Sequence, residues 1–237
     1  TELQLKDLET VENRIEKLEK QARHGKDAKT RKIYDIALKY KEILEQGKPA
    51  RTLMLYEEEK NIAGEFYFLT NKPVLYVCNV DEGSAVEGNE YVEHVKRAVA
   101  DEDAQVVVIA ASIEAEIAEL EDESEQHLFL VEMGLKESGL SRLIRKAYKL
   151  LNLETFFTAG PKEVRAWTVK RGTRAPQAGG TIHSDFERGF IKAEVIKYPD
   201  FLHYGSEAAC REAGRIHLEG KDYVVRDGDI IYFKFNV

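Results

Sequence analysis

The sequence has 237 residues, of which 43% are hydrophobic and 33% charged, and its formal net charge is -8. This composition is typical of a soluble globular protein with one large or two modest domains, and it excludes a polycationic nucleic-acid binder. No apolar run approaches the roughly 20 residues needed to cross a bilayer, so no membrane partner is expected. The two cysteines, Cys78 and Cys210, provide neither a disulfide framework nor a metal-ligand spacing, which favours a reducing, cytoplasmic location.

The first 48 or so residues carry two apolar stripes with helical spacing, which predict an antiparallel helical hairpin. The first stripe alternates steps of three and four residues, as in a coiled coil. It contains Leu8, Val11, Ile15, Leu18 and Ala22, and the second contains Ile33, Ala37, Tyr40 and Leu44. Asp27 is a plausible N-cap of the second helix, and residues 53–70 predict a further helical stretch. Because the chain begins with Thr1 inside a helical pattern, we expect it to be a piece of a longer polypeptide.

Two short apolar runs, Val74 to Cys78 and Val106 to Ala110, are rich in β-branched residues and do not alternate with polar ones. Such runs are typical of parallel strands that are buried on both faces. Helical patterns lie between and after them, at 91–99, 113–120, 123–133 and 140–151. This alternation predicts a parallel α/β sheet with right-handed crossovers. In such sheets, ligands bind beyond the carboxyl ends of the strands.

After Asn152 the pattern changes. Residues 155–161 are interpreted as a joint, and four strand-like runs follow at 164–169, 189–196, 223–225 and 230–235, with one helix near 206–213. Several strands and one helix in this length predict a small α+β domain of β-grasp type. The predicted boundaries are therefore 1–60 for the helical arm, 61–151 for the α/β part and 152–237 for the last domain.

The first strand ends in Asn79, Val80, Asp81 and Glu82. Guanine-binding P-loop proteins typically carry Asn-Lys-x-Asp here, with the Asp accepting from the guanine ring. With Val and Glu in the altered positions, we expect Asn79 and backbone groups to recognise adenine and Val80 to supply apolar packing. An Asx-type turn after a strand remains the structural alternative. At the end of the second strand lies a small-residue loop whose N–H groups would approach the base: Ala110, Ala111 and Ser112.

Four longer stretches are distinctive: Tyr148 to Leu153, Phe157 to Gly160, Glu163 to Thr168 and Ile182 to Phe190. They resemble the YchF/Obg-like ATPase family of translation-factor-class P-loop proteins. The segment from Glu219 to Asp229 resembles the TGS domain of the same family. The resemblance runs over nearly the whole chain and begins with the helical arm.

The resemblance implies a P-loop G domain with an inserted coiled-coil arm and a carboxy-terminal β-grasp TGS domain. It also implies slow hydrolysis of ATP, or of GTP, and association with ribosomes. It assigns Asn79, Val80 and Glu82 to the base-specificity motif, and residues 110–112 to the small-residue loop. The phosphate-binding motif G-x-x-x-x-G-K-[S/T] is absent from these 237 residues. Since the family carries it before the arm, the Mg²⁺ ligands are expected there, and these residues alone should not hydrolyse nucleotide.

The last domain contains a basic loop, Lys170 to Arg174, with aromatic residues nearby in sequence. It is either an ordinary solvated loop or a surface that faces RNA. His183 and His203 have no nucleophile or metal partner in the sequence and are interpreted as structural. The alternative function is therefore a binding module, in which the arm and the TGS domain hold ribosomal RNA or a protein and nucleotide only modulates the grip. A monomer is expected.

Overall fold

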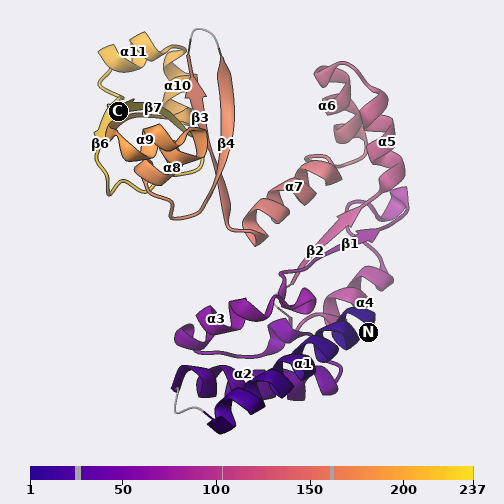
Figure 1. Ribbon diagram of the computed structural model, residues 1–237. Coiled ribbons are helices and arrows are strands. Elements are labelled where there is room, and N and C mark those ends of the chain that lie inside the picture. Colours follow the sequence, from indigo (N-terminus) through magenta and orange to yellow (C-terminus); the bar gives the residue numbers. More distant parts are fainter. Residues whose placement is uncertain (25–27, 103, 161–162, 237) are drawn as a thin grey trace. The chain divides into compact units, whose positions relative to one another are not determined.

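The computed structural model describes residues 1–24, 28–102, 104–160 and 163–236, without the side chains of residues 20–24. The chain divides into two compact units, Thr1–Leu140 and Ser141–Val237 (Figure 1). Each unit has its own hydrophobic core. The two sequence-based domain boundaries, at 60/61 and 151/152, stay predictions.

The first unit begins with two helices, α1 (Glu2–His24) and α2 (Ala28–Glu45). They are antiparallel, because Gln4 near the start of α1 donates to the carbonyl of Gly47 after α2, at 2.7 Å. Both predicted stripes face the shared core, which confirms the hairpin. The stripe residues that belong to that core or pack against it are Leu8, Val11, Ile15, Leu18, Ile33, Ala37, Tyr40 and Leu44. Ala22 and the predicted cap Asp27 lie outside the described side chains.

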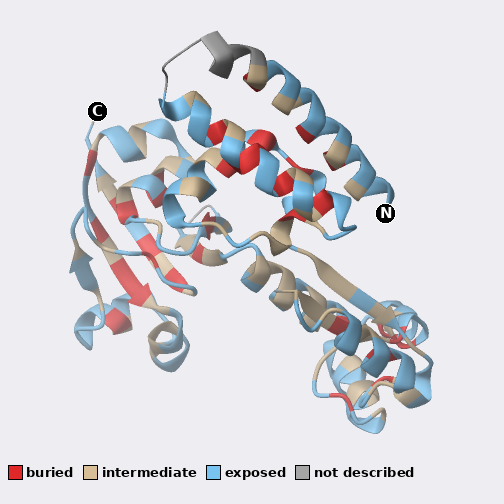
Figure 2. Cartoon of the chain, turned by 90° about the horizontal axis from the view of Figure 1, so that it is seen from below, coloured by how far each residue is buried: buried red, intermediate tan, exposed pale blue. Residues whose placement is uncertain are grey.

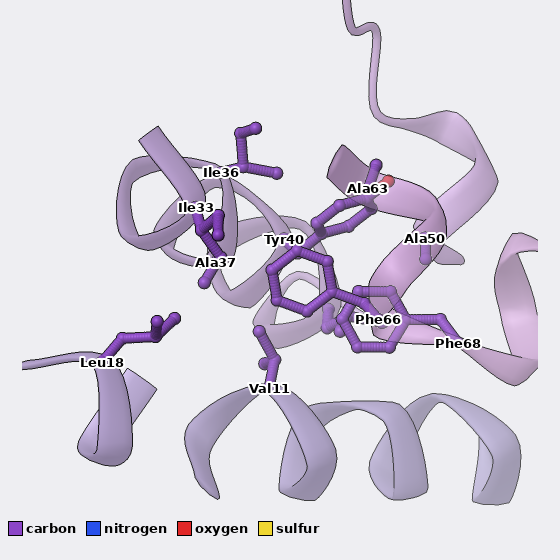
Figure 3. Close-up of a cluster of buried hydrophobic side chains, with 11 residues drawn as sticks. Val11, Leu18, Ile33, Ile36, Ala37, Tyr40, Ala50, Ala63, Phe66 and Phe68 are labelled. Carbon is purple, nitrogen blue, oxygen red and sulfur yellow. The ribbon is translucent and has the colours of Figure 1, made fainter. Parts of the chain in front are cut away.

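The chain after the hairpin is not the single helix predicted for 53–70. It contains the 3₁₀ turn η1 (Ala50–Thr52), the helix α3 (Glu57–Ala63) and two more 3₁₀ turns, η2 (Gly64–Phe66) and η3 (Leu69–Asn71). Phe66 and Phe68 both pack on Tyr40, with ring centroids 5.8 and 4.8 Å away (Figure 3). Residues two apart cannot share one face of a helix, so the helix ends and Tyr67 between them adopts a left-handed φ of 54°.

A buried carboxylate joins the hairpin to the rest of the first unit. Asp7 on α1 is 2% exposed. Its Oδ1 accepts from Leu69 N at 2.8 Å, and its Oδ2 accepts from Thr70 N and Thr70 Oγ1 at 2.7 Å each. Arg51 forms a second link through its 2.5 Å ion pair with Glu102.

Two parallel strands, β1 (Leu75–Asn79) and β2 (Gln105–Ile109), confirm the predicted parallel pairing. The 3₁₀ turn η4 (Glu82–Ser84) and α4 (Glu90–Ala98) lie between them, and α5 (Ala111–Glu119) and α6 (Glu123–Glu132) follow. Burial of β1 on both faces is wrong: Val77 is 49% exposed, and tan and blue run along the strand (Figure 2). In the described residues the sheet has two strands, which leaves part of β1 uncovered.

Helix α7 (Gly139–Leu150) leads into the second unit, whose five described strands are arranged in the order β4-β3-β7-β5-β6. They are β3 (Leu153–Ala159), β4 (Val164–Lys170), β5 (Phe190–Lys197), β6 (His217–Glu219) and β7 (Asp229–Phe235). Strand β7 pairs parallel to β3 and antiparallel to β5. This mixed sheet confirms the α+β class, while the identification as a TGS domain stays a prediction.

Three details of this unit differ from the sequence-based interpretation. Residues 155–159 of the segment interpreted as a joint belong to strand β3, and residue 161 lies outside the described residues. Tyr223 to Val225 contributes only an isolated bridge, from Val224 to Arg174. The described residues contain four helices after β4 rather than one: α8 (Ala175–Ile182), α9 (Ser184–Arg188), α10 (Tyr198–Tyr204) and α11 (Glu207–Glu212). Helix α8 covers the core face of the sheet, where Gly179 allows close approach because an added Cβ would lie 3.3 Å from the ring of Phe233.

Candidate functional site

The carboxyl ends of β1 and β2 lie side by side, because Asn79 and Ile109 are register partners. Two hydrogen bonds continue the pairing beyond the strands. Val80 N donates to the carbonyl of Ile109 at 2.8 Å, and Ala111 N donates to Asn79 Oδ1 at 3.0 Å. The structure therefore brings together the two predicted base-binding segments and holds them through the Asn79 side chain.

Asn79 is exposed although its oxygen is occupied. A primary amide has an acceptor oxygen and two N–H donors. With Oδ1 bonded to the α5 backbone, the amide nitrogen is the group that Asn79 can offer to a ligand. A donor suits the acceptor nitrogens of a purine ring.

Val80 points at least partly into the protein. It packs against a small core cluster that includes Ala110, Ile113 and Leu135. The apolar side chain at this position therefore helps to join the two predicted base-binding segments. A lysine at position 80 would place its aliphatic stem in the same partly buried position and would have to extend its ammonium group to solvent.

The acidic residues of the motif have different roles. Asp81 accepts at its Oδ1 from Ser84 N and from Ser84 Oγ, both at 3.0 Å, and so caps the turn η4. The alternative of an Asx-type turn thus applies to Asp81. Glu82 is the first residue of η4 and is exposed, so its carboxylate is accessible to a ligand.

The small-residue loop is the start of α5. Ala110 is its N-cap residue, is buried and provides no side-chain cap, and Ala111 and Ser112 occupy the exposed first turn. The first N–H groups of a helix have no partner within the helix. Asn79 takes that of Ala111, and the small side chains leave this turn open to a ligand.

Sequence reasoning missed Glu114, which fixes the position of α5. Its carboxylate accepts from Gly139 N at 2.6 Å and from Leu140 N at 3.0 Å, which caps the first turn of α7. Gly139 is required for this approach, because a Cβ there would lie 2.8 Å from Glu114 Oε1 and 3.2 Å from Ile109 Cγ1. A carboxylate and a helix start so far apart in sequence give no local signal.

The basic loop of the second unit is largely paired within the protein. Arg171 contacts Glu154 at 3.0 Å, and Arg174 contacts Asp222 at 2.8 Å. The aromatic residues near it in sequence pack in or against the core, among them Phe190, Phe186 and Trp167. The indole N–H of Trp167 donates to Thr158, and the guanidinium of Arg165 lies 4.2 Å from the Trp167 ring centroid.

Neither histidine singled out in the sequence has a catalytic geometry. Nδ1 of His183 accepts from Asp185 N at 3.2 Å and caps α9, as expected of a structural residue. The His203 ring lies edge-on to Tyr204. In the described ranges, no group of three or more metal-ligating side chains comes together. No described helix is long and apolar enough to cross a membrane.

Comparison with known proteins gives consistent matches. Residues 153–236 match the family YchF-GTPase_C, described as "protein of unknown function (DUF933)". The chain is 50% identical over 238 residues to the ribosome-binding ATPase YchF of Bacillus subtilis, covering all of this chain and 64% of that protein. It is 43% identical over 240 residues to Obg-like ATPase 1 of Pongo abelii, covering 99% of this chain and 60% of that protein.

Among solved structures, the YchF GTPase of Schizosaccharomyces pombe matches with a TM-score of 0.85 and 33% identity. The match covers 98% of this chain and 63% of that one. The chain thus spans somewhat less than two thirds of the length of these relatives.

Proposed function

Because this chain belongs to the YchF/Obg-like ATPase family, we propose that it supplies the base-recognising half of a nucleotide site. The protein that contains it binds ATP, hydrolyses it slowly, and acts as a regulatory switch on ribosomes. Relatives named ribosome-binding ATPase support both the nucleotide and the ribosome. The protein acts in the cytoplasm as a monomer.

The observation that carries the proposal is the hydrogen bond between Asn79 Oδ1 and Ala111 N. It couples the ends of β1 and β2 and orients the Asn79 amide so that its N–H groups are the free donors. Adenine has acceptor nitrogens on its ring and would accept such a donor. The exposed first turn of α5 supplies backbone groups beside it.

The experiment is calorimetric titration of ATP into the longer protein that also contains the phosphate-binding part. Asn79→Ala removes both the donor and the link to α5, and we expect ATP affinity to fall about tenfold, as for loss of one or two hydrogen bonds. Asn89→Ala is the matched control, since Asn89 also accepts one backbone hydrogen bond, from Val92 N at 3.2 Å, but caps α4. Equal ATP affinity in the Asn79 variant and the parent would contradict the proposal.

Preference for ATP over GTP is proposed to rest on Val80 and Glu82. The combined variant Val80→Lys and Glu82→Asp restores the residue types of guanine-binding proteins and should shift the ratio of ATP to GTP affinity towards GTP. Competition between the two nucleotides measures that ratio. A parent protein that prefers GTP would refute adenine recognition outright.

Hydrolysis requires groups that bind phosphates and Mg²⁺. Their motif is absent from the 237 residues, and among the described residues no metal-ligating cluster forms. We therefore expect these residues alone to release no phosphate from ATP, and the longer protein to do so slowly in the presence of Mg²⁺. Phosphate release by the 237 residues above that of buffer would contradict the proposal that the groups for hydrolysis lie outside them.

We propose that two parts of the chain contact the ribosome. They are the hairpin α1–α2, which is the predicted arm, and the second unit, which contains the predicted TGS domain. The alternative, a pure binding module, would bind ribosomes through the same parts whether or not nucleotide is present. Co-sedimentation of the 237 residues with ribosomes at low and high salt tests both. If the 237 residues are absent from the ribosome pellet at low salt, the binding-module function is excluded. If ATP does not change the ribosome binding of the longer protein, a binding module is favoured over a switch.

A further inference from the structure

The two faces of the five-stranded sheet in the second unit differ in how they are covered. One face packs on the core with α8 through residues such as Phe156 and Val195. Register partners in antiparallel strands point to the same face. On the opposite face, Glu194 of β5 lies between its partners Leu218 of β6 and Tyr232 of β7.

This opposite face remains partly open. Tyr232 is 56% exposed and Leu218 63% exposed, and at the other sheet edge Val164, the partner of Ala159, is 72% exposed. Ala159 and Tyr232 line the same hollow, of about 430 Å³, together with Phe201 from α10. Its volume lies within the range of about 300–1,000 Å³ of small-ligand pockets.

Cationic groups surround Tyr232 on this face. Nζ of Lys234 lies 4.0 Å from the Tyr232 ring centroid and 3.7 Å from Glu194 Oε1. The guanidinium of Arg211 reaches the other oxygen of Glu194 at 3.3 Å and also pairs with Glu207 at 3.0 Å. The partly buried Glu194 thus holds two cations at the rim of the hollow.

A third cation has no such partner. Lys192 is the register partner of Lys234, is exposed, and has no ion pair among the residues that the structure describes. Like charges directly opposite each other on antiparallel strands are destabilising. An anion placed between Lys192 and Lys234 would remove that repulsion, so the charge of this face complements a phosphate backbone.

We propose that this open sheet face binds single-stranded RNA, with a base stacked on Tyr232 and phosphates beside Lys192, Lys234 and Arg211. The proposal rests on the ribosome association proposed above and names the surface that contacts RNA. An exposed aromatic ring flanked by cations is the combination by which sheets bind single strands. The basic loop at 170–174 is not the main surface, because it contains no aromatic residue on which a base could stack.

The test is fluorescence anisotropy of a labelled oligouridylate of about 12 nucleotides titrated with the complete 237-residue chain. Tyr232→Ala should weaken binding about tenfold through loss of stacking, and Tyr232→Phe should bind as the parent does. Tyr91→Ala is the matched control, because Tyr91 is also exposed but belongs to α4 in the first unit. Thermal unfolding followed by Trp167 fluorescence verifies that the variants in the second unit fold, and circular dichroism at 222 nm does so for Tyr91→Ala.

Salt dependence supplies an independent readout. Lys192→Gln and Lys234→Gln should each lower the slope of log affinity against log salt by about one, whereas Arg171→Gln should leave it unchanged. The proposal would be overturned by unchanged binding of Tyr232→Ala, by a loss confined to the Arg171 variant, or by duplex RNA that binds as tightly as the single strand. A different combination of results would assign this sheet face to a protein segment instead of RNA. In that case the parent does not bind the oligonucleotide, and Tyr232→Ala no longer co-sediments with ribosomes. A parent that co-sediments but never binds the oligonucleotide refutes this inference and leaves the proposed function standing.

Discussion

The buried carboxylate of Asp7 offers the sharpest test of how the first unit is held together. Asp7→Asn keeps the size of the side chain but replaces one accepting oxygen with an amide donor. Asp7 receives one hydrogen bond at Oδ1, from Leu69 N, and two at Oδ2, from Thr70. If the amide nitrogen takes the Oδ1 place, Leu69 N–H faces another donor and loses its partner.

The expected loss can be worked out from these three bonds. A buried donor left without a partner costs about 2 kcal/mol, and each bond that changes from a charged to a neutral acceptor loses about 1 kcal/mol. The sum is about 4 kcal/mol of unfolding free energy. For the first unit, Thr1–Leu140, such a loss lowers the melting temperature by about 8–16 °C.

The two units provide an internal comparison for the assay. The single tryptophan, Trp167, belongs to the second unit, so its fluorescence reports that unit, whereas circular dichroism at 222 nm reports the helices of both. Asp7→Asn should lower the midpoint of the circular dichroism transition that the first unit contributes and leave the fluorescence transition in place. Asp35→Asn, an exposed position on α2, is the matched control, with an expected change below about 0.5 kcal/mol. A loss of less than about 1 kcal/mol for Asp7→Asn would refute the reasoning.

Further predictions concern α7 and the second unit. Gly139→Ala should destabilise the first unit by about 1–3 kcal/mol, because the new methyl group would overlap Glu114 Oε1. Urea unfolding followed by circular dichroism measures this loss, and an unchanged free energy of unfolding would contradict the close packing. Burial disfavours the charged form of Lys197, but its hydrogen bonds to Asp229 and Tyr223 prevail and raise its pKa, while burial and the bond to Asp229 raise the pKa of Tyr223. Folding thus favours the protonated forms of both groups. Their contribution to the free energy of unfolding is complete below about pH 10 and is lost as the pH rises beyond it. A Trp167 unfolding transition whose midpoint stays constant to about pH 11 would refute this. Asp229→Asn, at a fully buried carboxylate 2.6 Å from Lys197 Nζ, should cost about 3–5 kcal/mol at neutral pH and flatten the alkaline decline.

The hairpin and the parallel strands could be predicted from sequence because local periodicity determines them. Val11 and Tyr40 occupy stripes whose spacing fits only a helix, and both are buried. The run before Asn79 could be recognised as a strand from its length and its β-branched residues. These signals need no knowledge of residues far away in the chain.

Features that depend on distant partners could not be predicted. Polar and apolar residues alternate only in part along the segment that contains Glu154 and Phe156. Its identity as strand β3 comes from pairing with both β4 and β7. The pairs from Glu114 to Gly139 and from Asp7 to Thr70 join residues separated by several elements. The residues of the proposed nucleotide site could be named from sequence, but the hydrogen bond from Ala111 N to Asn79 Oδ1 that joins its two segments required the structure.

The position of β7 bears on how the second unit is made. Of the five described strands, β7 comes last along the chain, yet it lies at the centre of the sheet between β3 and β5. During synthesis, β3 and β4 can pair as a hairpin at once, but the edges of β3 and β5 stay unpaired until β7 has left the ribosome. Contacts between segments so distant in sequence form slowly, and unpaired edges favour aggregation. A ribosome that stalls before Asp229 would therefore hold a nascent chain whose second unit exposes two sheet edges, a state that a chaperone would protect from aggregation.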